Sequence, residues 1–138
     1  MFDHCLYFNT TALARLVEKT WALAFKPFGV TPPQGFMLRL VLKNPGLLQH
    51  EIATELTISR PTATRLLDGL QALKLIERQS IASDGRHWAI YPTAKATALH
   101  VGLNKASAEV TRRIQQQIGK DHFDETVARV RSVSSALK

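Results

Sequence analysis

The sequence predicts a mainly helical fold with one small β hairpin. Apolar residues recur at helical spacing through most of the 138 residues, whereas residues 75–81 and 87–92 have the pattern of two short strands. The five residues between these strands, Ala-Ser-Asp-Gly-Arg, are typical of a turn. The length is that of a single domain, and no apolar run reaches the roughly 18 residues that a membrane span needs.

Two helices are expected before the middle of the chain. Residues 5–27 carry apolar side chains at helical spacing, and Pro27 and Gly29 end this segment. The second helix should begin near Thr31, with two prolines in its first turn, where proline is tolerated. The Asn-Pro-Gly sequence at residues 44–46 should end it.

A pair of short helices precedes the hairpin. Residues 47–56 carry leucine or isoleucine at every fourth position, which predicts the first of the pair. Ser59 is then a good N-cap, because its hydroxyl can accept a hydrogen bond from a backbone N–H in the next turn. The buried stripe of the second helix is predicted to be Ala63, Leu66, Leu67, Leu70 and Leu73. Two short helices followed by strand, turn and strand predict a winged helix-turn-helix.

The C-terminal third is predicted to be helical. Thr93 should cap a helix that Gly119 ends, and a last helix should follow. A helix of roughly 25 residues spans about 38 Å, and its own chain offers too little protein to cover the apolar stripe. We therefore expect a homodimer in which residues 1–30 and 97–138 of two copies pack around a two-fold axis, with residues 31–96 as a separate lobe. The alternative is an all-helical monomer folded on itself.

Composition narrows the classes of function. The net charge of +7 and the pI near 10.0 favour a polyanionic partner, with nucleic acid ahead of an acidic membrane. The single cysteine excludes an internal disulfide and a cysteine-rich zinc site, and the five histidines are scattered, so no metal is expected. No phosphate-cradling glycine loop and no nucleophile with a recognisable base are present, so neither an enzyme nor a cofactor is expected. No apolar signal core follows the N-terminus, which makes a cytoplasmic location the expectation.

Polar donors gather at the start of the helix that Ser59 caps. An exposed helix with arginine and threonine in its first turns fits the major groove of double-stranded DNA, because arginine can bond guanine with two donors and threonine offers a hydroxyl and a methyl group. The preceding helix would cross the backbone and reach phosphate. The candidate DNA-binding residues on these helices are Ser59, Arg60, Thr62, Thr64, Arg65, Gln49 and His50. Each taken singly is also an ordinary solvated residue.

The turn between the strands supplies two more candidates. Arg86 at a hairpin tip is expected to enter the minor groove, where negative potential is concentrated. Asp84 is expected to hold Arg86 or to make the turn. The alternative is an ordinary Asp-Gly hairpin with an incidental arginine.

Residues 31–100 resemble the multiple-antibiotic-resistance regulator (MarR) family of bacterial transcription factors. The motifs are HEIATELTISRPTATRLLDGLQALKLIER, then SDGR, then YPTAKA. The resemblance implies a dimer, joined through the terminal helices, on a roughly palindromic operator, usually repressing and released by a small ligand or by oxidation. Lys74 stands where the family commonly has glycine, so the helix ends differently there or Lys74 adopts the left-handed conformation.

Cys5 is a candidate redox trigger. The stretch DHCLYFNTTALAR resembles the start of the thiol-sensing organic-hydroperoxide-resistance regulators, where an early cysteine is oxidised. Sulfenic acid at Cys5 would pass to a mixed disulfide with a small thiol or to a bridge between two copies. Tyr7 and Tyr91 are candidate hydroxyl partners of the sulfur. The alternative is a small buried hydrophobic residue.

A small-molecule effector is the rival trigger. In the family, ligands lodge between the dimerising helices and the DNA-binding lobe. The candidate pocket residues are Trp21, Phe25, Phe28, Phe36 and Met37, which are core residues in the alternative interpretation. Two other classes of function stay open, namely a winged-helix protein-interaction module that does not read DNA and a thiol-peroxidase-like enzyme using Cys5.

Overall fold

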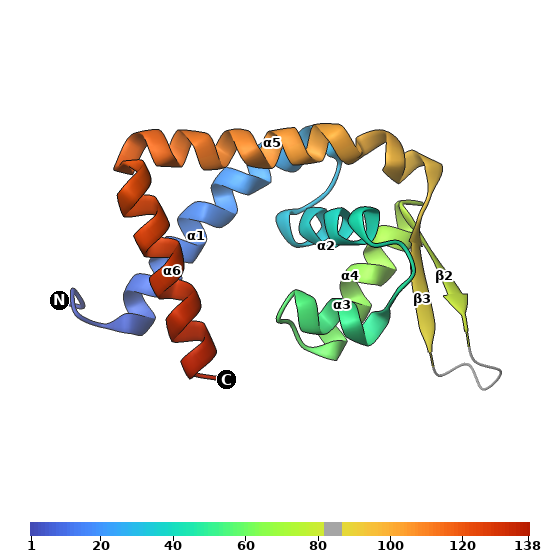
Figure 1. Ribbon diagram of the computed structural model, residues 1–138, viewed down its shortest axis with the longest axis horizontal. Coiled ribbons are helices and arrows are strands. Elements are labelled where there is room, and N and C mark those ends of the chain that lie inside the picture. The colour runs from blue at the N-terminus through green and yellow to red at the C-terminus, as the bar shows by residue number, and fades with distance from the viewer. Residues whose placement is uncertain (82–86) are drawn as a thin grey trace.

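The computed structural model describes residues 1–81 and 87–138. In chain order the elements are α1 (Leu6–Phe25), η1 (Lys26–Phe28), α2 (Pro32–Lys43), β1 (Leu47–Leu48), α3 (Gln49–Glu55), α4 (Arg60–Ala72), β2 (Ile76–Ser80), β3 (Trp88–Pro92), α5 (Ala94–Ile118) and α6 (Lys120–Ala136). The long helix α5 connects two ends of the molecule (Figure 1). The start of α1, the helix α6 and both termini lie at one end, and the elements from α2 to β3, here called the winged lobe, lie at the other (Figure 1).

Three hydroxyl side chains cap the N-termini of three helices, as the sequence predicts. Thr31 accepts a hydrogen bond from the backbone N–H of Gln34 at 3.3 Å, and the Gln34 side chain accepts in return from the Thr31 N–H. Ser59 starts α4 and Thr93 starts α5 with the same bond to the N–H three residues on, each at 3.2 Å. Each bond satisfies a donor that the first helical turn would otherwise leave unpaired.

The sheet has one strand more than the sequence predicts. Strands β2 and β3 form the expected antiparallel hairpin, with Arg78 opposite Ile90. The prediction of a helix over residues 47–56 is wrong at its first two residues, because Leu47 and Leu48 pair with Ile90 and Ala89 as β1 and give the strand order β1-β3-β2. The spacing of leucines along the sequence does not reveal this long-range backbone pairing.

Both helices of the helix-turn-helix end on a residue with positive φ that is not glycine. After α4, Lys74 has φ 60°, its N–H donates to the carbonyl of Gln71, and the N–H of Leu75 donates to that of Leu70. After α3, Thr57 has φ 54° and takes part in the equivalent bonds. This pattern is the Schellman motif, whose left-handed position usually holds glycine. Of the two possibilities for Lys74, the structure shows the left-handed one.

The hydrophobic core joins the winged lobe to the long helices. Side chains with no more than 2% exposure include Phe25, Met37, Leu38, Ile52, Leu67, Leu70, Leu75, Ile76, Ile90 and Leu103. They come from α1, α2, α3, α4, the turn after α4, the sheet and α5, whereas α6 contributes no buried residue. The lobe is thus anchored on α5 and on the end of α1, and α6 lies outside the core.

A polar cluster crosses the junction between α1, α2 and α5. Ser107 on α5 is only 6% exposed, and its hydroxyl oxygen accepts hydrogen bonds from Nε1 of Trp21 at 3.1 Å and from Nη1 of Arg39 at 3.0 Å. Arg39 also donates through Nε to Oδ1 of Asn104 at 2.7 Å, and partial burial of its guanidinium lowers the pKa of Arg39. One hydroxyl therefore joins three helices.

Candidate nucleic-acid interface

Helix α4 buries one face and exposes the other. Ala63, Leu67 and Leu70 are buried against the rest of the lobe, as the sequence predicts. Arg65 projects from the opposite, exposed face, whereas exposed Arg60 stands at the first position of the helix on the side of α3. Because buried positions recur every three or four residues, the polar residues between them are held on a single outer surface. The candidate donors on α4 are therefore presented outward by the packing of the helix.

The first turn of α4 is held by hydroxyl groups. The Ser59 oxygen accepts from the Thr62 N–H and donates to the Thr62 hydroxyl at 2.9 Å. The Arg65 guanidinium makes a long contact of 3.4 Å with the Thr62 hydroxyl. Ser59 and half-buried Thr62 therefore organise the start of the helix, and the exposed arginines at positions 60 and 65 are its outward charges.

Gln49 links the two helices. Its side-chain Nε2 donates to Oγ1 of Thr64 at 2.9 Å, and that hydroxyl donates to the backbone carbonyl of Arg60 at 3.0 Å. Both side chains were expected from the sequence to face DNA, and the structure shows that they also set the position of α3 against α4. His50, the next residue of α3, is exposed.

Arg78 on β2 is a residue of this surface that the sequence did not point to. Its Nη2 lies 2.8 Å from Oδ1 of Asp68, its Nη1 donates to Oε1 of Gln71 at 2.8 Å, and its side chain is 17% exposed. Nη2 also lies 3.4 Å from the carbonyl of Thr64. The contact neutralises the acidic residue on the outer side of α4 and ties that helix to the hairpin. The sequence pattern does not predict this ion pair, because Asp68 and Arg78 are ten residues apart and lie on different elements.

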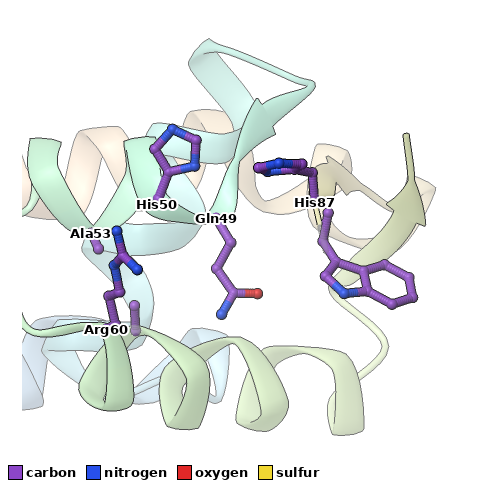
Figure 2. Close-up of a pocket in the computed structure, with 7 residues that line it drawn as sticks. Gln49, His50, Ala53, Arg60 and His87 are labelled. Carbon is purple, nitrogen blue, oxygen red and sulfur yellow. The ribbon is translucent and has the colours of Figure 1, made fainter. Parts of the chain in front are cut away.

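A hollow of about 230 Å³ lies between α3, α4 and the start of β3. It is lined by Gln49, His50, Ala53, Arg60, Ala63, His87 and Trp88. Figure 2 shows the Arg60 side chain extending from α4 towards α3 and the Gln49 side chain between the two helices, with His50 and His87 above them. The centroids of the two imidazole rings are 6.3 Å apart. His87 and Trp88 were not among the residues singled out from the sequence.

Two of the sequence candidates, Asp84 and Arg86, lie outside the described residues. Their roles at the tip of the hairpin stay predictions.

The five candidate pocket residues divide between a hollow and the core. Trp21 and Phe36 line an apolar hollow of about 360 Å³ together with side chains of α1, α2, α4 and the turn before α4. Phe25 and Met37 have no exposed surface and belong to the hydrophobic core, which is the alternative interpretation of these side chains. Phe28 is half-buried and lies against α5 at Gly102. Aromatic side chains at helical spacing can line a pocket or fill a core, and only their packing in the tertiary structure distinguishes the two.

Cys5 precedes the first residue of α1 and is exposed. The amide of Asn9 holds this segment by donating to the carbonyl of Cys5 at 2.8 Å and to two carbonyls before it. The expectation of a buried small residue is thus not met within one chain. Exposed Tyr7 lies in the first turn of α1, whereas Tyr91 in β3 lies at the other end of the molecule and is not a partner of the sulfur in the same chain (Figure 1).

Two searches of residues 1–81 and 87–138 bear on other partners. No group of three or more histidine, cysteine, aspartate or glutamate side chains in this part of the chain has an arrangement that would hold a metal ion. Within the same residues, none of the helices has both the length and the apolar character to cross a membrane.

The comparisons with known proteins agree with one another. The MarR family model matches residues 28–87, which run from the last residue of η1 to the residue before β3. The uncharacterized HTH-type transcriptional regulator YybA of Bacillus subtilis (strain 168) is 23% identical over 99 residues, or 72% of this chain and 66% of that protein. The match thus spans slightly under two thirds of this relative's length.

Solved structures extend the likeness to almost the whole chain. The transcriptional repressor CouR bound to a 23-mer DNA duplex is 28% identical, with a TM-score of 0.86 over 96% of this chain and 94% of that one. The S. aureus MepR–DNA complex shares the fold, with a TM-score of 0.85 at 23% identity over 95% of this chain and 96% of that one. The terminal helices, which lie outside the family model, therefore belong to the same fold. Residues 28–87 therefore resemble the MarR family of transcriptional regulators, and nearly the whole chain has the fold of the repressor CouR.

Proposed function

We propose that this protein is a dimeric, sequence-specific DNA-binding repressor that acts in the cytoplasm and inserts α4 into the major groove. The observation that carries the proposal is the division of α4 into a buried apolar stripe and an exposed face with Arg65, together with exposed Arg60 at the start of the helix. Both compared structures, CouR and MepR, are complexes with DNA. A protein-interaction surface is less consistent with this face, because the core of such an interface usually offers apolar anchors.

The length and the charge of α4 are compatible with insertion into the major groove of DNA. Its 13 residues span about 20 Å at 1.5 Å per residue, and a helix of that size fits a groove about 12 Å wide. Among the described residues, no side chain forms a hydrogen bond with the Arg60 guanidinium. This charge is therefore available for a phosphate or a guanine edge, and the net charge of +7 supports the approach to a polyanion.

The dimer is proposed from the apolar side chains that one chain leaves in water. At the end of the molecule remote from α4, the exposed large hydrophobic residues are Leu6, Tyr7, Phe8, Leu13 and Leu16 of α1, with Val127, Val130 and Val133 of α6 and Leu137 after it (Figure 1). Contiguous apolar surface of this kind marks an interface, and a second copy related by a two-fold axis would cover it. Two copies of α4 would then meet major grooves about 34 Å apart on a roughly palindromic operator.

Two triggers for release are proposed from different observations. The apolar hollow beside Trp21 and Phe36 is bounded by α1, α2 and α4, so a small ligand bound there would change the position of α4 relative to α1. Exposed Cys5 is accessible to an oxidant at the proposed dimer end. Either trigger releases DNA only to the extent that it favours the conformation with the wrong spacing of the two α4 helices.

The proposal is tested by selecting bound duplexes from a random-sequence library and titrating the recovered duplex by fluorescence anisotropy. Affinity should fall steeply with salt, and Arg65→Ala should weaken binding by about 1–3 kcal/mol if it reads a guanine, or flatten the salt slope by about 0.9 if it contacts phosphate. Arg113→Ala, an exposed arginine of α5, is the matched control and should bind like the parent. Recovery of no preferred sequence, together with salt-independent binding, would contradict the proposal.

The triggers are separated by one further comparison. The parent and Cys5→Ser are treated with peroxide and then titrated with the selected duplex. Loss of affinity in the parent alone supports the cysteine as the trigger. Equal affinity of both proteins would leave the apolar hollow as the remaining candidate.

A further inference from the structure

We propose that the hollow between α3, α4 and the start of β3 holds one phosphate of the DNA backbone, and that His50 and His87 make DNA binding stronger as the pH falls. The inference rests on the proposed function, because it concerns how the same surface engages DNA. It assigns a ligand to a site whose lining includes residues outside the exposed face of α4.

The position of the hollow follows from groove geometry. If α4 enters a major groove and the β2–β3 hairpin enters the adjacent minor groove, one strand of the sugar–phosphate backbone must pass between them, because that strand separates the two grooves. The hollow lies at this place, with α3 and α4 on two sides and the start of β3 on the third (Figure 2). The backbone is therefore brought to the hollow by the docking of the elements on either side.

The lining is matched to an oxyanion. Arg60 brings a permanent positive charge, the Gln49 amide brings N–H donors, and the imidazoles of His50 and His87 stand 6.3 Å apart, centroid to centroid. In the described part of the chain, neither imidazole has a hydrogen-bond partner. A phosphate oxygen is a strong acceptor for each of these groups.

Among residues 1–81 and 87–138, no carboxylate lines the hollow. Glu51 and Glu55 of α3 border His50 on its other side, and Glu51 accepts from the backbone N–H of Leu48 at 2.9 Å. Asp68 of α4 is held by Arg78, and Glu77 of β2 lies opposite Tyr91 rather than beside His87. In the part of the chain that the structure describes, the groups that would face the phosphate are thus cationic or neutral.

The direction of the pH effect follows from linkage. Histidine is the side chain that ordinarily changes charge between about pH 5 and 8, and an adjacent anion favours its protonated form. A phosphate placed between His50 and His87 therefore binds together with protons, so acid conditions strengthen the complex. Each protonated imidazole that contacts a phosphate also steepens the dependence of the logarithm of affinity on the logarithm of salt by about 0.9.

The experiment titrates the labelled duplex recovered by selection with four full-length proteins, at several salt concentrations and at several values between about pH 5 and 8. The proteins are the parent, His50→Gln with His87→Gln, His87→Gln alone, and His122→Gln as a control on exposed α6. Glutamine keeps hydrogen-bonding capacity without a titratable charge. The parent and the control should gain on the order of tenfold in affinity towards acid, the scale of one charge-assisted contact, and the salt slope should steepen.

The double variant should lose this gain and the single variant part of it. If the double variant binds the duplex with the same pH dependence as the parent, the phosphate assignment is wrong and DNA recognition by α4 stands. If the parent binds no duplex under any of these conditions, the proposed function fails and the phosphate assignment fails with it. Circular dichroism spectra matching that of the parent would show that the exposed substitutions leave the fold intact.

Discussion

Lys74→Gly should stabilise this protein. Lys74 occupies the left-handed position of the Schellman motif that ends α4, with φ 60°. Its backbone N–H donates to Gln71, and its carbonyl accepts from the hydroxyl of Thr93 at 2.7 Å. These bonds come from the main chain and remain in the variant, whereas the exposed side chain of Lys74 makes no hydrogen bond or ion pair with the described residues.

The magnitude comes from two opposing terms. A side chain in the left-handed region costs about 1–2 kcal/mol because Cβ approaches the following carbonyl oxygen. Glycine removes that cost but loses about 0.5–1 kcal/mol through the greater freedom of its unfolded chain. The free energy of unfolding of Lys74→Gly should therefore rise by about 0.5–1 kcal/mol relative to Lys74→Ala, which keeps Cβ and removes only the charged stem.

The assay is urea unfolding followed by circular dichroism for the parent, Lys74→Ala and Lys74→Gly. All are measured at one protein concentration, because association would make stability depend on concentration. A rise in midpoint with an unchanged slope reports stability alone. If Lys74→Gly proves no more stable than Lys74→Ala, the left-handed backbone is not the source of strain, and the reasoning is refuted.

Further expectations concern the contacts between the long helices and the winged lobe. Gly35→Ala should destabilise by about 1–3 kcal/mol, less the gain in helix propensity, because a Cβ there would overlap the buried ring of Phe25. Gly69→Ala is its control, since a Cβ there meets a single side-chain atom, Nε2 of Gln34 at 2.9 Å, and thermal melts should show a smaller loss than for Gly35→Ala. Ser107→Ala should lower the free energy of unfolding by about 1–3 kcal/mol, because Trp21 and Arg39 lose a shared buried acceptor. Urea unfolding measures this change, and an unchanged midpoint would mean that water replaces the hydroxyl.

Local sequence determined most of the secondary structure. A capping side chain occupies the position just before a helix begins. The first residues of α2, α4 and α5 therefore follow from the positions of Thr31, Ser59 and Thr93. The apolar stripe of α4 likewise follows from spacing, because a helix brings every third or fourth residue to one face. The outward direction of Arg65 is a consequence of that stripe.

Tertiary structure alone decided which distant residues meet. Leu47 and Leu48 became β1 by pairing with β3, and the joining of Trp21 and Arg39 through Ser107 depends on three helices coming together. The placing of Phe25 in the core and Phe36 beside a hollow was also decided by packing, since both have the same side chain on helices. His50 and His87 lie far apart in the chain, and only the folding of the hairpin against α3 brings their rings to one hollow. Short-range patterns set what a segment becomes, because caps and periodicity act within a few residues, whereas a binding surface depends on contacts between segments that no local pattern encodes.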